Sequence, residues 1–209
     1  MRYLALLAVV AFLAGCSSAP PVPADHFYRL PFPKQLGPAH LGTTDLDLRL
    51  GEVAIVQPFR STGLHNERAL LYSDDPGGLR LKRYHYHLWT DAPPKLLQEQ
   101  LAAYLRRAKA ARLVRTSSGP IPNHLITGHI YRFEQHVKPK GREVFVELEL
   151  GVERPGEYKP FVSRRYATQK LVSGDAVKVV DVVAQFGAAV DEIYSRFLTD
   201  LADGIAKAK

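Results

Sequence analysis

The sequence predicts an α+β fold, in which two helices pack on one face of an antiparallel or mixed β-sheet. Residues 144–152 alternate apolar and polar side chains with a period of two, which indicates a half-buried strand. Similar strands are expected on both sides of it, joined by tight turns into an antiparallel meander. An apolar stripe at helical spacing near the C-terminus predicts a long helix that covers the sheet.

The first half of the chain contains shorter strand candidates. Residues 27–30 form a short aromatic stretch, and residues 52–57 read as a strand that ends before Pro58. Residues 68–73 and 79–89 are separated by an Asp-Asp-Pro-Gly-Gly turn, so we expect them to pair as a hairpin.

A helix is expected directly after this hairpin. Thr90 or Asp91 can cap it, and Pro93 and Pro94 suit a first turn that needs no amide partner. A short strand at 113–116 should follow. The apolar residues that recur on one helix face are Leu97, Leu101, Tyr104, Leu105 and Ala108.

The second half is predicted to hold the meander and the long helix. Residues 125–137 and 161–172 flank the alternating strand, and the Pro155–Gly156 pair suits the centre of a type II turn. The helix should run from about Asp175 to Ala206. Its apolar stripe consists of Val179, Val182, Val183, Phe186, Val190, Ile193, Phe197 and Leu201.

The N-terminus has the pattern of an export signal. Arg2 precedes an uninterrupted apolar run at 4–13, which suits a signal-peptide core and is too short to span a bilayer. Leu13-Ala14-Gly15-Cys16 then resembles the bacterial lipobox, in which the cysteine becomes the acylated N-terminus after cleavage. The alternative is an ordinary signal peptide followed by an incidental cysteine.

The domain organisation follows from this assignment. Residues 1–15 are the lipoprotein signal peptide, 16–26 a lipid-anchored flexible tether rich in Ser, Ala and Pro, and 27–209 one folded domain. Ser17 stands where lipoproteins retained at the inner membrane commonly carry Asp, so the resemblance implies an outer-membrane, periplasm-facing location.

Composition restricts the possible partners and chemistry. Cys16 is the one cysteine, so neither an intrachain disulfide nor thiol catalysis is expected. Without Arg2, 27 basic and 21 acidic side chains give a net charge of +6, which suits an anionic membrane or an acidic partner. Nucleic acid is not an expected partner of an exported protein.

The candidates for chemistry are sparse. The sequence has no G-x-S-x-G elbow, phosphate loop or H-E-x-x-H helix, so no catalytic residue, metal or cofactor is assigned and the protein is not expected to be an enzyme. His85 and His87 could share a metal, but an aromatic row is the favoured interpretation. Asp74-Asp75 is interpreted as a turn because the oxygen spacing of a calcium loop is missing.

Two basic segments have no assigned role from sequence. The Arg164-Arg165 pair and the Lys138, Lys140 and Arg142 hairpin could contact anionic lipid or an acidic partner. Solvated loops explain them equally well.

An ordered set of short motifs resembles the ABC-type transport auxiliary lipoprotein family, which includes the lipoprotein of the paraquat-inducible intermembrane transport system. The set spans the mature chain in order and is strongest from Arg68 to Leu105. Its members are Phe27-Tyr28-x-Leu30, the Val53 strand, Arg68-x-Leu70-x-Tyr72, Tyr86-x-x-Trp89-x-Asp91-x-Pro93, Leu96-Leu97 and Leu101.

The resemblance implies a binding role. The protein would assist an inner-membrane ABC permease and ATPase and an MCE-domain substrate-binding protein in moving lipid or another hydrophobic solute. Tyr84, Tyr86 and Trp89 are the candidate partner-binding residues, because aromatic side chains with a polar tip recur at interface centres. Packing of Trp89 onto the helix that contains Leu97 is the alternative, and self-association stays open.

Two other classes of function remain possible from the sequence. One is a structural lipoprotein that assists assembly of an outer-membrane barrel or secretion complex. The other is an anchored hydrolase, for which the sequence offers no nucleophile and base motif.

Overall fold

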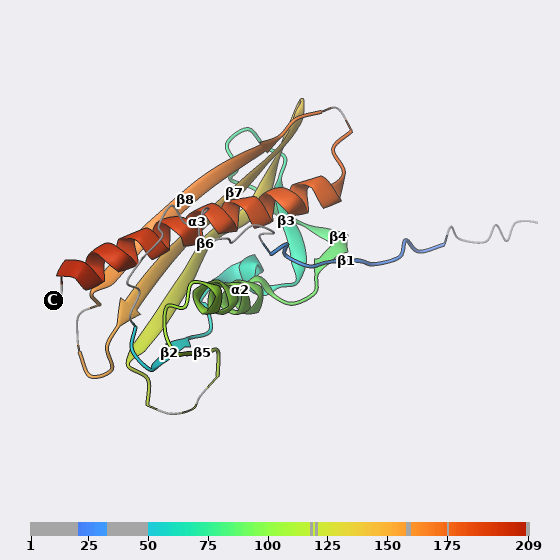
Figure 1. Cartoon of the computed structure of the whole chain (residues 1–209). Helices are drawn as coiled ribbons and strands as arrows, with labels where there is room; N and C mark the ends of the chain where they lie inside the picture. The colour runs from blue at the N-terminus through green and yellow to red at the C-terminus, as the bar shows by residue number, and fades with distance from the viewer. Residues whose placement is uncertain are drawn as a thin grey trace, which may run out of the picture.

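The computed structural model of the chain shows a mixed sheet with helices along one face (Figure 1). The residues that the structure describes are 21–32, 50–117, 119, 121–157, 160–174 and 176–207. The elements are β1 (His26–Tyr28), β2 (Val53–Val56), η1 (Gly63–Asn66), β3 (Ala69–Ser73), β4 (Leu81–Trp89), α2 (Pro93–Arg107), β5 (Leu113–Arg115), β6 (His124–Lys138), β7 (Gly141–Glu153), β8 (Val162–Val172) and α3 (Val179–Lys207).

Among the described residues, eight strands are arranged around β6. One edge of β6 pairs with β7 in antiparallel orientation, and β8 follows β7. The other edge is shared, because β2 pairs in parallel with the start of β6 and β3 pairs in parallel with its end. Strand β5 extends the sheet beyond β2, and β4 and then β1 extend it beyond β3.

The predicted meander is confirmed as β6, β7 and β8. The alternation in β7 matches its burial, because the even residues from Val144 to Val152 face the core and their neighbours face away from the helices. Gly156 has a positive φ of 85°, as the predicted type II turn requires.

The predicted hairpin is confirmed as β3 and β4. Its turn is organised by Asp75, whose carboxylate accepts bonds from the backbone amides of Leu79 (2.9 Å) and Arg80 (3.0 Å) and from the Ser73 hydroxyl (2.6 Å). The Ser73 hydroxyl and these two amides hold the pKa of Asp75 far below its usual range.

Both helices cover the same face of the sheet, as predicted. The Tyr194 hydroxyl on α3 donates to the Leu97 carbonyl on α2 at 2.8 Å, and the Tyr194 ring lies 5.7 Å from that of Tyr104. Seven of the eight predicted stripe residues of α3 are buried, and Val179 is half-buried. The helix begins at Val179, four residues later than expected, after Gly174 with a φ of 133°.

The expected cap of α2 was wrong. Ala92 is the cap residue and provides no side-chain bond, while Asp91 pairs with Lys95 at 2.9 Å. The physical reason is that Pro93 and Pro94 occupy the first two helical positions. They have no backbone N–H, so a capping side chain has little to accept there.

The helices and the sheet enclose one hydrophobic core, which includes residues from β2 through α3. Within the part of the chain described above, no helix is both long and apolar enough to cross a bilayer.

Candidate functional site

The N-terminal chain enters the folded part at the outer strand of the sheet. Figure 1 shows the extension leaving the molecule beside β1 and β4. Residues 21–25 are exposed, and Cys16 lies outside the described residues. The position where β1 begins therefore fixes where an anchor at Cys16 would attach to the domain.

Strand β1 is attached to the β3–β4 hairpin. It pairs in parallel with β4, with Tyr28 opposite Trp89. The Thr90 amide donates to the Tyr28 carbonyl at 2.9 Å, and the Arg68 guanidinium lies 5.2 Å above the Phe27 ring. This short strand thus contacts the hairpin region through its backbone and through the Phe27 ring.

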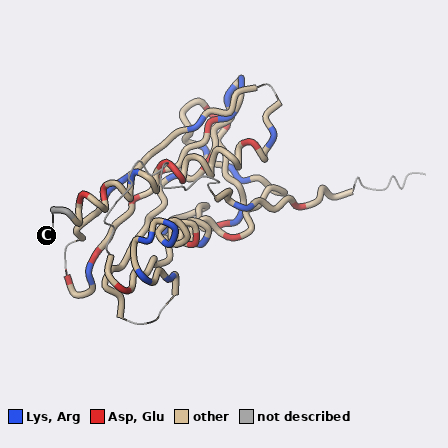
Figure 2. Tube along the Cα trace, viewed as in Figure 1, with Lys and Arg blue, Asp and Glu red and all other residues tan. Residues whose placement is uncertain are grey.

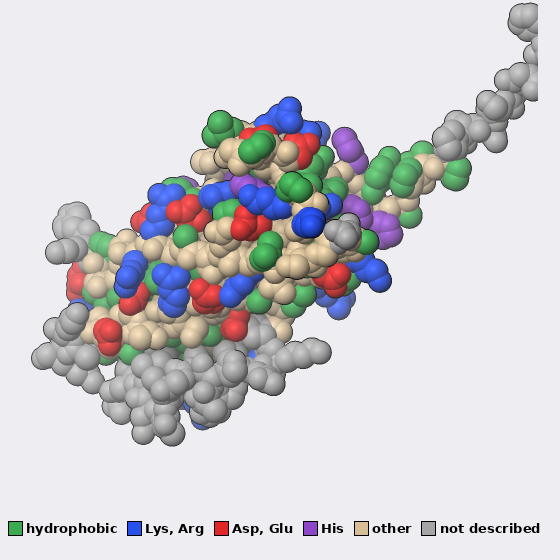
Figure 3. All heavy atoms as spheres, turned by 90° about the horizontal axis from the view of Figure 1, so that it is seen from above, with side chains coloured by type: hydrophobic (Ala, Val, Ile, Leu, Met, Phe, Trp, Pro, Cys, Tyr) green, Lys and Arg blue, Asp and Glu red, His purple; other side chains and the backbone are tan. Residues whose placement is uncertain are grey.

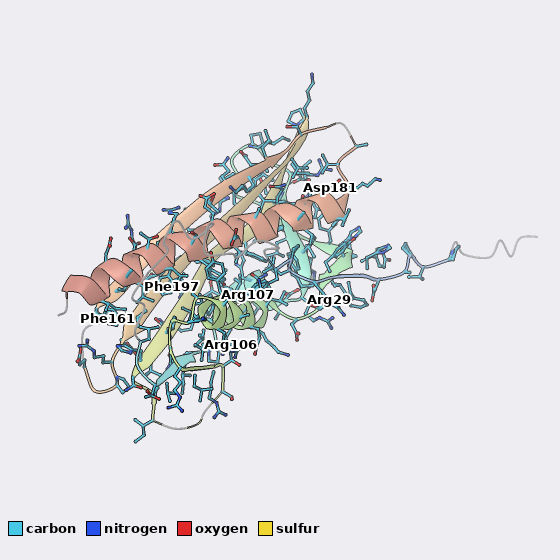
Figure 4. All side chains as sticks on the ribbon, in the orientation of Figure 1. Arg29, Arg106, Arg107, Phe161, Asp181 and Phe197 are labelled. Carbon is cyan, nitrogen blue, oxygen red and sulfur yellow. The ribbon has the colours of Figure 1, made fainter. Side chains whose placement is uncertain are left out.

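The residues after β1 are attached to both helices. The Gln100 side chain on α2 donates to the Pro31 carbonyl at 2.8 Å. Pro31 packs so closely on α3 that a Cβ at Gly187 would lie 3.0 Å from the proline ring. Arg107, labelled on α2 in Figure 4, lies 4.1 Å from the Phe32 ring centroid. We call His26–Phe32 the tether junction.

Several motifs of the sequence resemblance meet at the tether junction, whereas the Val53 strand pairs with β5 and β6 instead. The Trp89 amide donates to the Arg68 carbonyl at 2.6 Å, and the Arg68 side chain donates to the Trp89 carbonyl at 3.1 Å. Tyr28 pairs with the same tryptophan, and α2 follows four residues later. Segments that are far apart in sequence therefore form one contact network around β1.

Tyr84 and Tyr86 occupy different environments. Tyr84 is half-buried, accepts a bond from Gln135 at 3.1 Å, and packs its ring 4.5 Å from Tyr72. Burial raises its pKa above the usual value. Tyr86 is 37% exposed, so it is the residue of the predicted pair that a partner can reach.

Trp89 lies in the core, which corrects its assignment to a binding surface. It is 1% exposed, and its ring lies 5.4 Å from both Phe133 on β6 and Phe186 on α3. The alternative that the sequence left open, packing of Trp89 onto the helix that contains Leu97, is right that the side chain is buried but not about its ring partners, which are Phe133 of β6 and Phe186 of α3.

His85 and His87 are arranged as part of an aromatic row. The His87 ring stacks on His26 with centroids 5.3 Å apart, and its Nδ1 is bonded to the Tyr28 hydroxyl at 2.9 Å. Figure 3 shows histidine side chains gathered where the N-terminal extension leaves the folded part. Among the described residues, no group of three or more His, Cys, Asp and Glu side chains is placed to hold a metal ion.

The basic segments are largely paired with acids. Arg164 binds Asp200 at 3.0 Å and Arg165 binds Glu147 at 2.7 Å. Lys138 binds Glu143 at 3.1 Å. Figure 2 shows basic and acidic positions interspersed along the trace.

Sequence reasoning missed a buried polar cluster on the sheet face opposite the helices. Glu134 is 5% exposed, and its carboxylate binds Arg132 Nε at 2.6 Å and lies 3.4 Å from His65 Nε2. Arg132 in turn lies 2.9 Å from His136 Nε2. Burial raises the pKa of Glu134, but the hydrogen bonds from His65 and Arg132 outweigh it, and the pKa lies below its usual value.

The β3–β4 turn closes over this cluster at Gly78. Its φ is 66°, and a Cβ there would lie 2.3 Å from the His136 ring. The glycine therefore permits both the left-handed backbone and the close approach. Nothing in the local pattern of residues 124–138 signals this burial, because η1 and the turn come from distant segments.

An open cleft of about 910 Å³ lies near β2 and β5, at the other end of the sheet from β1. Ile55 and Leu125 contribute apolar surface, while Arg60, Thr127 and Glu153 contribute polar groups. Such a lining suits a ligand with both polar and apolar parts.

Comparison of the sequence with family models and with curated proteins finds no match. Among solved structures, the fold is similar to protein XCC0632 from Xanthomonas campestris, which is described by the family model DUF330. The TM-score is 0.70 at 12% identity, over 88% of this chain and 98% of that one. An uncharacterised protein matches with a TM-score of 0.58 at 11% identity, over 88% and 99% of the two chains.

A minor lipoprotein from Acinetobacter baumannii overlaps 72% of this chain and 90% of its own, at 11% identity and a TM-score of 0.37. That overlap is too loose to support an argument. The likeness to XCC0632 and to the uncharacterised protein shows that this chain has the same α+β fold as two solved proteins along nearly their whole length.

Proposed function

We propose that the chain is a lipid-anchored envelope protein and the auxiliary component of an ABC-type transport system. In this proposal Cys16 carries the acyl chains at the outer membrane, and the domain binds an MCE-domain protein that works with an inner-membrane permease and ATPase. The protein positions its partner and catalyses no reaction.

The observation that supports the proposal is the convergence at the tether junction. Most of the residues that resemble the transport auxiliary lipoproteins lie in β1, β3, β4 and α2, whereas the Val53 strand is β2, at the other end of the sheet. Strands β1, β3 and β4 pair with one another, and α2 contacts the chain just after β1 through Gln100, near the point where the tether enters. Because the chain that follows the tether contacts both helices, a membrane anchor at its end would restrain the domain as a whole.

The proposed contact surface is the exposed part of β4 around Tyr86. It lies on the outer hairpin of the sheet, next to the tether junction, and 37% of Tyr86 is accessible. Tyrosine combines apolar area with a hydroxyl that can form a hydrogen bond, and it is enriched at the energetic centres of interfaces.

Photo-crosslinking in cells tests the proposal. A photoreactive residue at position 86 is expected to capture an MCE-domain protein, and mass spectrometry of the adduct identifies it. The same residue at position 121 is the matched control, since Ile121 is 89% exposed but follows β5 at the other end of the sheet. Recovery of barrel or secretin components alone from position 86 would contradict the transport role and favour an assembly role.

A further inference from the structure

Strand β1 is a short element held by titratable side chains. It contributes three residues to a parallel pair, and a strand of this length adds few backbone bonds. Two of its side chains, the exposed His26 and the half-buried Tyr28, contact His87 of β4. His26 stacks on the His87 ring with an angle of 17° between the planes, and the Tyr28 hydroxyl is bonded to Nδ1 at 2.9 Å.

The rest of the tether junction is held in another way. The Pro31 carbonyl accepts a hydrogen bond from the side-chain amide of Gln100, and the Pro31 ring packs against Gly187. The Phe32 ring lies against Arg107. None of these side chains changes its charge between about pH 5 and pH 8. The junction therefore has a pH-sensitive part, β1, and a pH-insensitive part, Pro31–Phe32.

The electrostatics at His87 oppose its protonation while β1 is docked. Burial lowers the pKa of His87, and the charge of His26 lowers it further. The titratable groups that face His87 are His26 and Tyr28 from β1 and Tyr84 from its own strand, whose ring edge lies 5.2 Å away. Asp25, just before His26, is exposed.

We propose that acidification releases β1 from β4 while Pro31–Phe32 stays bound, so that β1 acts as a pH-sensitive extension of the tether. The docked state binds fewer protons than the released state. Docking is therefore fully favourable above the ordinary histidine pKa of about 6.5 and weakens as the pH falls below it.

Release changes how far the domain can lie from its anchor, a consequence that rests on the proposed lipidation of Cys16. The ten residues from Cys16 to His26 span at most ~36 Å when fully extended. Freeing the chain as far as Leu30 adds four residues, or roughly 13 Å.

Hydrogen exchange of the mature chain in detergent micelles tests the release. The reporters are the amides of His26–Tyr28 and that of Thr90, which donates to the Tyr28 carbonyl. Rates are divided by those of a peptide with the same sequence, which removes the intrinsic effect of pH. Protection of these amides is expected to fall up to about tenfold between about pH 7.5 and pH 5.5, while that of α3 stays constant.

Variants separate the histidine pair from other causes. H87F retains a ring but does not titrate, and H26Q removes the stacked charge, so the double variant should lose the pH dependence. H85Q is the matched control, since His85 is exposed, lies two residues from His87, and should leave the pH dependence unchanged.

Two results would overturn the inference: protection that is equal at both pH values in the native protein, or pH dependence that persists in the H26Q/H87F variant. The exchange measurement does not depend on acylation or on a partner. A negative exchange result would therefore not contradict the proposed function. If the proposed function proved wrong, the exchange result could still be interpreted.

Discussion

Replacing Trp89 with alanine is expected to lower the free energy of unfolding by about 3–5 kcal/mol, the usual cost of removing a large buried aromatic ring. The side chain is 1% exposed and lies between Phe133 of the sheet and Phe186 of α3. Its removal leaves a cavity at the contact between the two layers. Urea unfolding followed by far-UV circular dichroism measures the effect, because W89A removes the chain's one tryptophan.

The matched control is Y86A on the same strand. Tyr86 is 37% exposed, so its truncation should change stability by less than about 1 kcal/mol. A W89A variant as stable as Y86A would contradict the placement of Trp89 in the core. The two variants also separate a binding role from a structural one among the predicted partner-binding residues. Y86A should weaken partner capture without unfolding the domain.

Replacing Glu134 with glutamine is expected to destabilise the protein by about 2 kcal/mol at neutral pH. The substitution keeps the shape but removes the charge that Arg132 and His65 face. The cost falls below that of a fully buried ion pair, because the Arg132 side chain is 35% exposed. E67Q is the control, because Glu67 forms a solvent-exposed ion pair with Arg83. Loss of that ion pair should cost less than about 1 kcal/mol.

The pH dependence gives this prediction a second readout. The pKa of Glu134 is lowered by folding, so its contribution is complete above the unfolded value of about 4.3 and is lost as the pH falls through the folded value. Native protein should therefore lose more stability on acidification below about pH 4.5 than E134Q does. Parallel losses in both proteins would show that the carboxylate is not bonded as described.

Local patterns were sufficient to predict the strands and the two long helices, but not the 3-10 helix η1. The alternation in residues 144–152 and the glycine of the Pro155–Gly156 turn lie within single elements, where side-chain period and backbone sterics decide the structure. The stripe of α3 was equally readable, because a buried helix face recurs at a fixed spacing.

The pairing of distant segments was not readable in this way. Strands β2 and β3 share one edge of β6, and β1 pairs in parallel with β4. No residue pattern within these strands specifies which strand each one pairs with. Trp89 ends a strand that alternates only in part, so its exposure could not be derived from period. Whether it contacts solvent is decided by α3, almost a hundred residues later.

The polar cluster around Glu134 shows the same limit. Glu134 and His136 occupy alternate positions on a strand whose other face is mostly apolar, which is the usual pattern of a solvent-facing side. Their burial depends on η1 and on Gly78 in the β3–β4 turn. A polar strand face is informative only together with what covers it.

The central claim is that this domain is held to a membrane through Cys16, and mass spectrometry of the mature N-terminus tests it most directly. Protein isolated from the cell envelope should begin at Cys16 and carry the added mass of diacylglycerol and an amide-linked acyl chain. C16S should accumulate as an unacylated precursor that still begins at residue 1. A native N-terminus at another residue, or an unmodified thiol at Cys16, would contradict the account.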